Sequence, residues 1–247
     1  MSNEILILTG LIFLAATLYA SVGHAGASGY LAAMALMGVA PATMKPTALI
    51  LNILVASIAC IKYYRVGAFA WKLFLPLVIG SIPLAYIGGG MSLPNHIYKP
   101  IVGAVLIYAA AYSFFTAHKA STATAFAPPP LIVLLCAGAA LGFLSGLTGV
   151  GGGIFLSPLM LMLRWAPVKV ISGVAAAFIL VNSIAGLLGL ITVAPTLPTG
   201  IYYWAVAAVV GGFIGAEFGS KRLGNPSIQR LLALVLLIGG VKMVASA

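Results

Sequence analysis

Long apolar runs, separated by short stretches of Gly, Pro and charged residues, fill this chain. The runs do not alternate apolar and polar residues as the strands of a membrane barrel do, so they predict helices. Each half of the chain holds five of them. The predicted segments are residues 4–22, 29–40, 46–63, 71–92 and 97–117, then 131–147, 153–165, 168–193, 200–220 and 227–246.

The second segment of each half is too short to cross a bilayer. At ~1.5 Å per residue, residues 29–40 and 153–165 cover roughly 18 to 20 Å of a ~30 Å hydrocarbon core. Each follows a glycine-rich interruption, SVGHAGASG at 21–29 and SGLTGVGGG at 145–153. Unwound backbone inside a bilayer is tolerated only beside protein or a watery cavity, so two such breaks in matching places predict a site.

The two halves align with each other, which predicts a duplicated unit. The expected organisation is a first transmembrane repeat at 1–120, a Pro-rich linker at 121–130 and a second repeat at 131–247. We therefore predict an all-α polytopic membrane protein with about eight full transmembrane helices and two short half-helices after the breaks. The matched pairs include Ser21 with Ser145, Gly29 with Gly153, Ser57 with Ser183, Gly80 with Gly211 and Gly88 with Gly219.

Loop charges predict that the second repeat is inverted. Basic residues mark the cytoplasmic side of a membrane protein, and equivalent loops of the two halves differ in basic content. The inversion places the linker inside and both termini outside. The loop between the third and fourth segments of the first half holds Lys62, Arg65 and Lys72, while its counterpart in the second half, 192–200, holds no basic residue. The loop between the fourth and fifth segments shows the reverse, with Lys99 alone in the first half but Lys221, Arg222 and Arg230 in the second.

The composition limits which classes of partner this chain can have. With 63% hydrophobic and 6% charged residues, the chain cannot present an ordinary water-exposed surface. The net charge of +10 comes from loop residues without any nucleic-acid-binding module, so we expect a lipid bilayer and no nucleic acid as partner. Cys60 and Cys136 lie in apolar runs and predict neither a disulfide nor a metal site, and no cofactor is expected. The first run lacks a basic leader and a cleavage pattern, so it is predicted to be a span and not a signal peptide.

The breaks themselves predict an anion-binding site. A helix start carries unpaired N–H groups and a partial positive charge, and glycines leave these groups accessible. Hydroxyl and amide side chains nearby would add donors. The alternative is that the glycines only allow close helix packing. The predicted substrate-binding residues are Ser21, His24, Gly26, Ala27, Ser28, Gly29, Asn52, Ser145, Thr148, Gly149, Gly151, Gly152, Gly153 and Asn182.

Several charged residues admit two interpretations. Glu217 could carry a coupling proton or form a boundary ion pair with Lys221 at position i+4. His24 could be linked to a proton or make plain hydrogen bonds. Lys45 and Lys169 could attract anions to a vestibule, or could mark a membrane boundary and snorkel.

An intramembrane serine protease is a further alternative, because residues 26–29 reproduce the G-x-S-G stretch of rhomboid proteases. A nucleophilic serine needs a base within hydrogen-bond reach. The equivalent stretch of the second half, Gly151 to Gly153, has no serine, so the duplication argues against catalysis. We expect no enzyme.

The second break, with residues 142–153, 155–158 and 175–182, resembles the TauE/SafE family of membrane anion permeases, and residues 21–29 with 44–52 are a weaker version of the same pattern. The resemblance implies export of sulfite or a small organosulfur anion such as sulfoacetate across the bacterial cytoplasmic membrane. His24, Ala25, Ala27 and Ser28 stand where the family is often richer in glycine, which leaves the exact anion open.

The expected function is therefore a secondary transporter that works by alternating access. An anion channel of the same architecture is the chief alternative, and a membrane scaffold that transports nothing is another. A homodimer is left open. No ATP-binding loop is present, so a proton gradient or the membrane potential would supply the energy.

Overall fold

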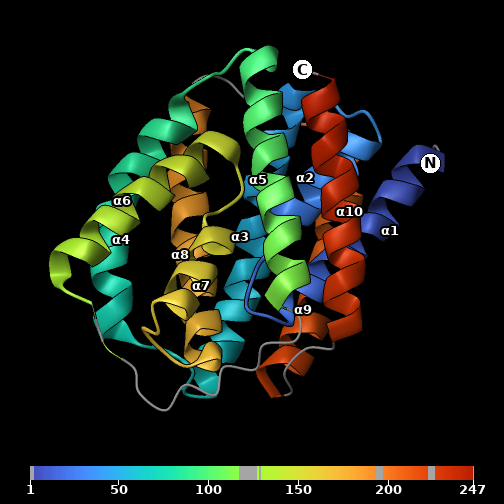
Figure 1. The fold of residues 1–247 in the computed structure, drawn as a ribbon. Helices are drawn as coiled ribbons and strands as arrows, with labels where there is room; N and C mark the ends of the chain where they lie inside the picture. The colour runs from blue at the N-terminus through green and yellow to red at the C-terminus, as the bar shows by residue number, and fades with distance from the viewer. Residues whose placement is uncertain (1–2, 117–126, 128, 193–196, 222–225, 247) are drawn as a thin grey trace.

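The computed structural model describes residues 3–116, 127, 129–192, 197–221 and 226–246, and every regular element in these ranges is an α-helix (Figure 1). Most of the predicted linker, with His118 and Lys119 before it, lies outside the described residues. The helices are α1 (Asn3–Ala20), α2 (Ala27–Leu36), α3 (Pro41–Arg65), α4 (Trp71–Gly90), α5 (Asn95–Thr116), α6 (Leu131–Thr148), α7 (Gly153–Met162), α8 (Val168–Ile191), α9 (Ile201–Lys221) and α10 (Pro226–Ala245).

Each predicted segment corresponds to one of these helices. α2 and α7 have 10 residues each, so the two short helices after the glycine breaks are confirmed. Among the described residues, 6 helices are long and apolar enough to cross a membrane, namely α1, α3, α4, α6, α8 and α9. The other long helices, α5 and α10, have 22 and 20 residues. The chain is an all-α polytopic membrane protein.

The helices of the two halves pair reciprocally. α1 packs along α9, and α6, which occupies the position of α1 in the second half, packs along α4. α3 lies against α8 at the centre, while α5 lies beside α10 on one flank, as Figure 1 shows. Two related halves would make these exchanged contacts. The inversion of one half relative to the other stays a prediction.

Glycines on the contact faces allow the backbones of the paired helices to touch. A Cβ atom on Gly215 would lie 2.0 Å from the carbonyl oxygen of Thr17, and one on Gly219 would lie 1.9 Å from that of Ser21. A Cβ atom on Gly138 of α6 would likewise lie 2.1 Å from the carbonyl oxygen of Leu77 in α4. α9 therefore has a small-residue packing face.

The outer surface is apolar, as a bilayer requires. On α9 the side chains of Val206, Phe213 and Phe218 are exposed, while Gly211, Gly215 and Gly219 of the same helix are buried. This pattern reverses that of a soluble helix, which turns its large apolar side chains inward. The exposed faces are suited to lipid chains.

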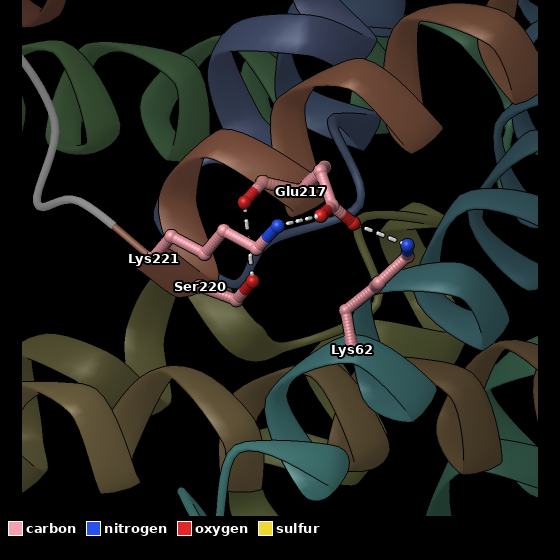
Figure 2. A network of polar contacts seen from close by, with 4 residues as sticks. All are labelled: Lys62, Glu217, Ser220 and Lys221. Carbon is pink, nitrogen blue, oxygen red and sulfur yellow. Dashed lines mark hydrogen bonds and ion pairs between the residues drawn. The ribbon is translucent and has the colours of Figure 1, made fainter.

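An ion-pair network holds one end of α9 to α3. The Glu217 carboxylate pairs with Lys221 one turn later and also with Lys62 of α3, as Figure 2 shows. The Lys62 Nζ atom lies 4.2 Å from the ring centre of Phe213. The predicted boundary ion pair with Lys221 is confirmed. Lys62, the second partner, was not predicted, because nothing in the spacing of α3 and α9 indicates that they cross there.

Candidate functional site

The two glycine breaks meet inside the molecule. His24 in the first break places its Nε2 atom 3.1 Å from the carbonyl oxygen of Gly153, at the end of the second break. The same atom lies 3.1 Å from the hydroxyl of Ser157 on α7, and Nδ1 lies 3.2 Å from the carbonyl oxygen of Val22. One imidazole ring therefore links the two halves at the point where both helices are broken.

Each short helix begins at a glycine in the left-handed conformation. The residue that precedes α2 is Gly26, with φ of 108°, and the one that precedes α7 is Gly152, with φ of 78°. A side chain at either position would be strained, and neither helix start has a side-chain cap. The first N–H groups of a helix have no partner within it, so both starts can offer donors to an anion.

A small cavity lies at the first break. Its volume of about 10 Å³ is roughly the room for one water molecule, so an anion of several heavy atoms fits only after the helices move apart. Its polar groups come from Tyr19, His24 and Ser28, and the Ser28 hydroxyl donates to the Tyr19 oxygen at 2.7 Å. The lining residues are Tyr19, His24, Ala25, Gly26, Ala27, Ser28, Val150, Ile154 and Ile179.

The second break packs against α3 and α8. A Cβ atom on Gly151 would lie 2.8 Å from the Nδ2 atom of Asn52 and 3.3 Å from the hydroxyl oxygen of Ser183. Asn52 donates from Nδ2 to that hydroxyl at 3.3 Å, while Asn182 donates to the carbonyl oxygen of Phe178 at 2.8 Å. The amide donors of both asparagines are thus bonded inside the protein in this conformation.

The remaining predicted residues do not line the cavity. The Ser21 hydroxyl donates to Leu18, and the Thr148 hydroxyl donates to Leu144, each within its own helix end. The remaining predicted glycines are packed closely. A Cβ atom would meet Ala15 and Tyr19 at Gly29, Lys45 at Gly149, Phe178 and Ser145 at Gly152, and Ile179 at Gly153.

Three tyrosines bond to backbone carbonyl groups at the two breaks. Tyr98 of α5 donates to Thr148 at 3.1 Å, and Tyr63 of α3 donates to Ser21 at 2.9 Å. Tyr30 of α2 donates to Ala25. Sequence reasoning missed all three, although a hydroxyl in an apolar run signals that a partner must exist. These bonds satisfy acceptors that the broken helices leave free.

Lys45 has a different role from those predicted. Its side chain is buried, and Nζ donates to the carbonyl oxygens of Gly88, Gly89 and Met91 at 3.1, 2.8 and 3.2 Å. These groups form the carboxyl end of α4, whose partial negative charge favours a cation. The ammonium group therefore caps a helix, instead of snorkelling to water or lining a vestibule.

A larger groove lies elsewhere, on the side of α6 and α7. It has a volume of about 430 Å³ and is lined by apolar side chains with Cys136 and Trp165 among them. It offers no charged group and faces outward, where lipid chains lie. The first break, where polar groups converge, is the better candidate site.

Comparison with known proteins agrees with this architecture. The sulfite exporter TauE/SafE family matches residues 8–243. The chain is 38% identical to the probable membrane transporter protein y4hK of Sinorhizobium fredii, over 98% of this chain and 99% of that one. It is 31% identical to a probable membrane transporter protein of Methanocaldococcus jannaschii, over 55% of this chain and 51% of that one. No solved structure matches.

Proposed function

Because the chain belongs to the sulfite exporter TauE/SafE family and is a multi-pass membrane transporter, we propose that it exports a small sulfur-containing anion, sulfite or a sulfonate such as sulfoacetate. The membrane would be the cytoplasmic membrane of a bacterium. Transport would be secondary, by alternating access.

The observation that carries this proposal is the meeting of the two breaks at His24 and Gly153. The starts of α2 and α7 then lie beside one another, and their N–H groups and partial positive charges would act together on an anion. Tyr19 and Ser28 would add hydroxyl donors next to the first start. Oxygen atoms of a sulfite or sulfonate group are the acceptors that such donors bind.

The cavity at the first break is closed in this conformation, which fits a carrier between its open states and also a closed channel. About 10 Å³ leaves no path for an anion, so the helices around the first break must separate before it can bind. The reciprocal pairs of helices, α1 with α9 and α6 with α4, are two units that could rock against each other across α3 and α8. The inside-negative potential contributes ~2.3 kcal/mol per charge per 100 mV toward anion exit.

The hydrogen bonds of Ser28 do not favour the protease alternative. Its hydroxyl donates to Tyr19, and His24 bonds to backbone oxygens and to Ser157 instead. A serine nucleophile requires a base that accepts its proton. We therefore propose that the chain is not an enzyme.

The proposal is tested by binding and conductance of the purified protein. Sulfite, thiosulfate, sulfate, taurine and sulfoacetate are each titrated in detergent, and we expect saturable binding of sulfite or a sulfonate with weaker binding of sulfate. In planar bilayers we expect no single-channel conductance with the preferred anion. Step-like currents would instead support a channel, and absence of binding to every compound would support a scaffold.

A further inference from the structure

Three buried oxygen atoms beside the second break have no hydrogen-bond partner among the described residues. They are Oδ1 of Asn52, Oδ1 of Asn182 and Oγ of Ser145, and each of these side chains has 0% of its surface exposed. A buried polar atom without a partner is costly, and native proteins contain few of them. Three in one region therefore require a partner, which a bound ion or buried water would supply.

All three lie around the same stretch of backbone. The Asn52 amide lies against Gly151, and the Cβ atom of Ser145 would be 3.3 Å from a Cβ atom on Gly152. Asn182 stands one helical turn from Phe178, whose ring packs on Gly152, and one turn from Gly186, which faces Gly146. The three side chains thus come from α3, α6 and α8, the helices around the second break.

The unpartnered atoms are oxygens. One N–H of each amide is bonded, Asn52 to Ser183 and Asn182 to Phe178. The two amide oxygens can only accept, the Ser145 hydroxyl oxygen can accept too, and the carboxyl end of α6 nearby carries a partial negative charge. A hard cation suits such oxygens, since neutral oxygens are its usual ligands.

The absence of negative charge on these three side chains favours a monovalent cation. None of the three side chains is a carboxylate, and the described residues hold no group of His, Cys, Asp and Glu that could bind a metal. Unwound backbone and the carboxyl ends of broken helices are where transporters coordinate Na⁺. Amides and hydroxyls take up no proton near neutral pH, so a proton would not use these atoms.

We propose that the oxygens of Asn52, Asn182 and Ser145 contribute to a Na⁺ site at the second break. This site is distinct from the small cavity at the first break, and Ile179 stands between them, since it lines that cavity and packs on Gly151. The proposal rests on the proposed export function for its role. If the carrier reorients between the two sides of the membrane only when Na⁺ or the anion is bound, inward movement of Na⁺ would drive outward movement of the anion.

Thermal unfolding of the purified full chain tests the site without any sulfur anion present. The melting temperature is measured in NaCl and in choline chloride at equal ionic strength. We expect a saturable rise with Na⁺ that is lost in Asn52→Leu and in Ser145→Ala. It should persist in Ser81→Ala, a matched control, because Ser81 is equally buried but bonds to the carbonyl oxygen of Val78.

Equal melting temperatures of the parent protein in the two salts would overturn the site and leave these oxygens to buried water. If the variants fail to fold, radioactive Na⁺ binding to the parent decides, with displacement by unlabelled Na⁺ but not by choline as the expected result. Anion binding is measured separately in choline chloride. A Na⁺ response without anion binding would refute the proposed function alone, and the reverse would refute the site alone.

Discussion

The imidazole of His24 bonds to the carbonyl group of Gly153, although the two residues are 129 positions apart in the chain. The contact joins the first break to the second, and the Ser157 hydroxyl reinforces it. The other ring nitrogen lies 3.2 Å from the carbonyl oxygen of Val22, and a neutral ring donates to one of the two carbonyl groups at a time. The histidine thus fixes how the two short helices stand toward each other.

Replacing this ring should loosen the site. A neutral imidazole donates from one nitrogen only, so His24 satisfies one of the two carbonyl groups, of Gly153 or of Val22, at a time. His24→Ala removes that bond and the contact with Ser157, and a buried acceptor left unpaired costs about 1–3 kcal/mol. We expect a lower melting temperature and a lower initial rate of sulfite flux in liposomes, by about tenfold where a loss of 1.4 kcal/mol falls on the rate-limiting step. His24→Gln, which keeps a donor, should retain more activity. Flux at the parental rate in His24→Ala would contradict this role.

A methyl group on Gly151 should block transport. Its φ of 84° already disfavours a side chain by about 1–2 kcal/mol, and the new Cβ would lie 2.8 Å from both Asn52 and Ile179. Gly38→Ala is the matched control, because Gly38 has a φ of 72° but open space around it. We expect sulfite flux to be lost only in Gly151→Ala, with both variants monodisperse on gel filtration. Equal flux in the two variants would show that the second break tolerates bulk.

Removing the Lys45 ammonium group should destabilise the end of α4. Lys45→Met leaves the carbonyl groups of Gly88, Gly89 and Met91 without their buried donor, and bonds to charged groups contribute about 1.5–3 kcal/mol each. We expect a clear fall in melting temperature in detergent. Lys169→Met, at an exposed position on α8, is the control and should change it little. A similar small effect in both would mean that the helix cap contributes no net stability.

Neutralising Glu217 distinguishes its two interpretations. Glu217→Gln removes both ion pairs at a partly exposed boundary, so the loss of stability should be small. A structural ion pair predicts that the pH dependence of sulfite flux is unchanged. Flux that no longer responds to an imposed pH gradient in this variant would instead assign a coupling proton to the carboxylate.

The helices could be predicted from the sequence because bilayer thickness and glycine punctuation leave few alternatives. α7 begins at Gly153 as predicted, while α2 begins at Ala27, two residues before the predicted start, because Gly26 is the last residue of the break in the left-handed conformation. The match of Ser21 with Ser145 was only partly right, because Ser21 follows the end of α1 whereas Ser145 still lies in the last turn of α6 and the second break spans 149–152. The meeting of the two breaks was expected from their presence together with the repeat.

The partners of individual polar groups could not be predicted in the same way. Nothing along the chain brings Tyr98 to Thr148, Lys62 to Glu217 or Lys45 to the end of α4, since these contacts depend on the rotation of each helix about its axis. One signal was available for Lys45. A lone cation inside an apolar helix needs several acceptors, and the end of a neighbouring helix supplies them.

The central claim, that the joined breaks form the site of an anion carrier, is tested most directly by counterflow. Liposomes holding the purified protein are preloaded with unlabelled sulfite and diluted into a trace of radiolabelled sulfite. We predict transient accumulation of label that depends on preloading, is present in Gly38→Ala and is absent in Gly151→Ala. Uptake that is the same with and without internal sulfite would contradict a carrier, and normal counterflow in Gly151→Ala would contradict the site.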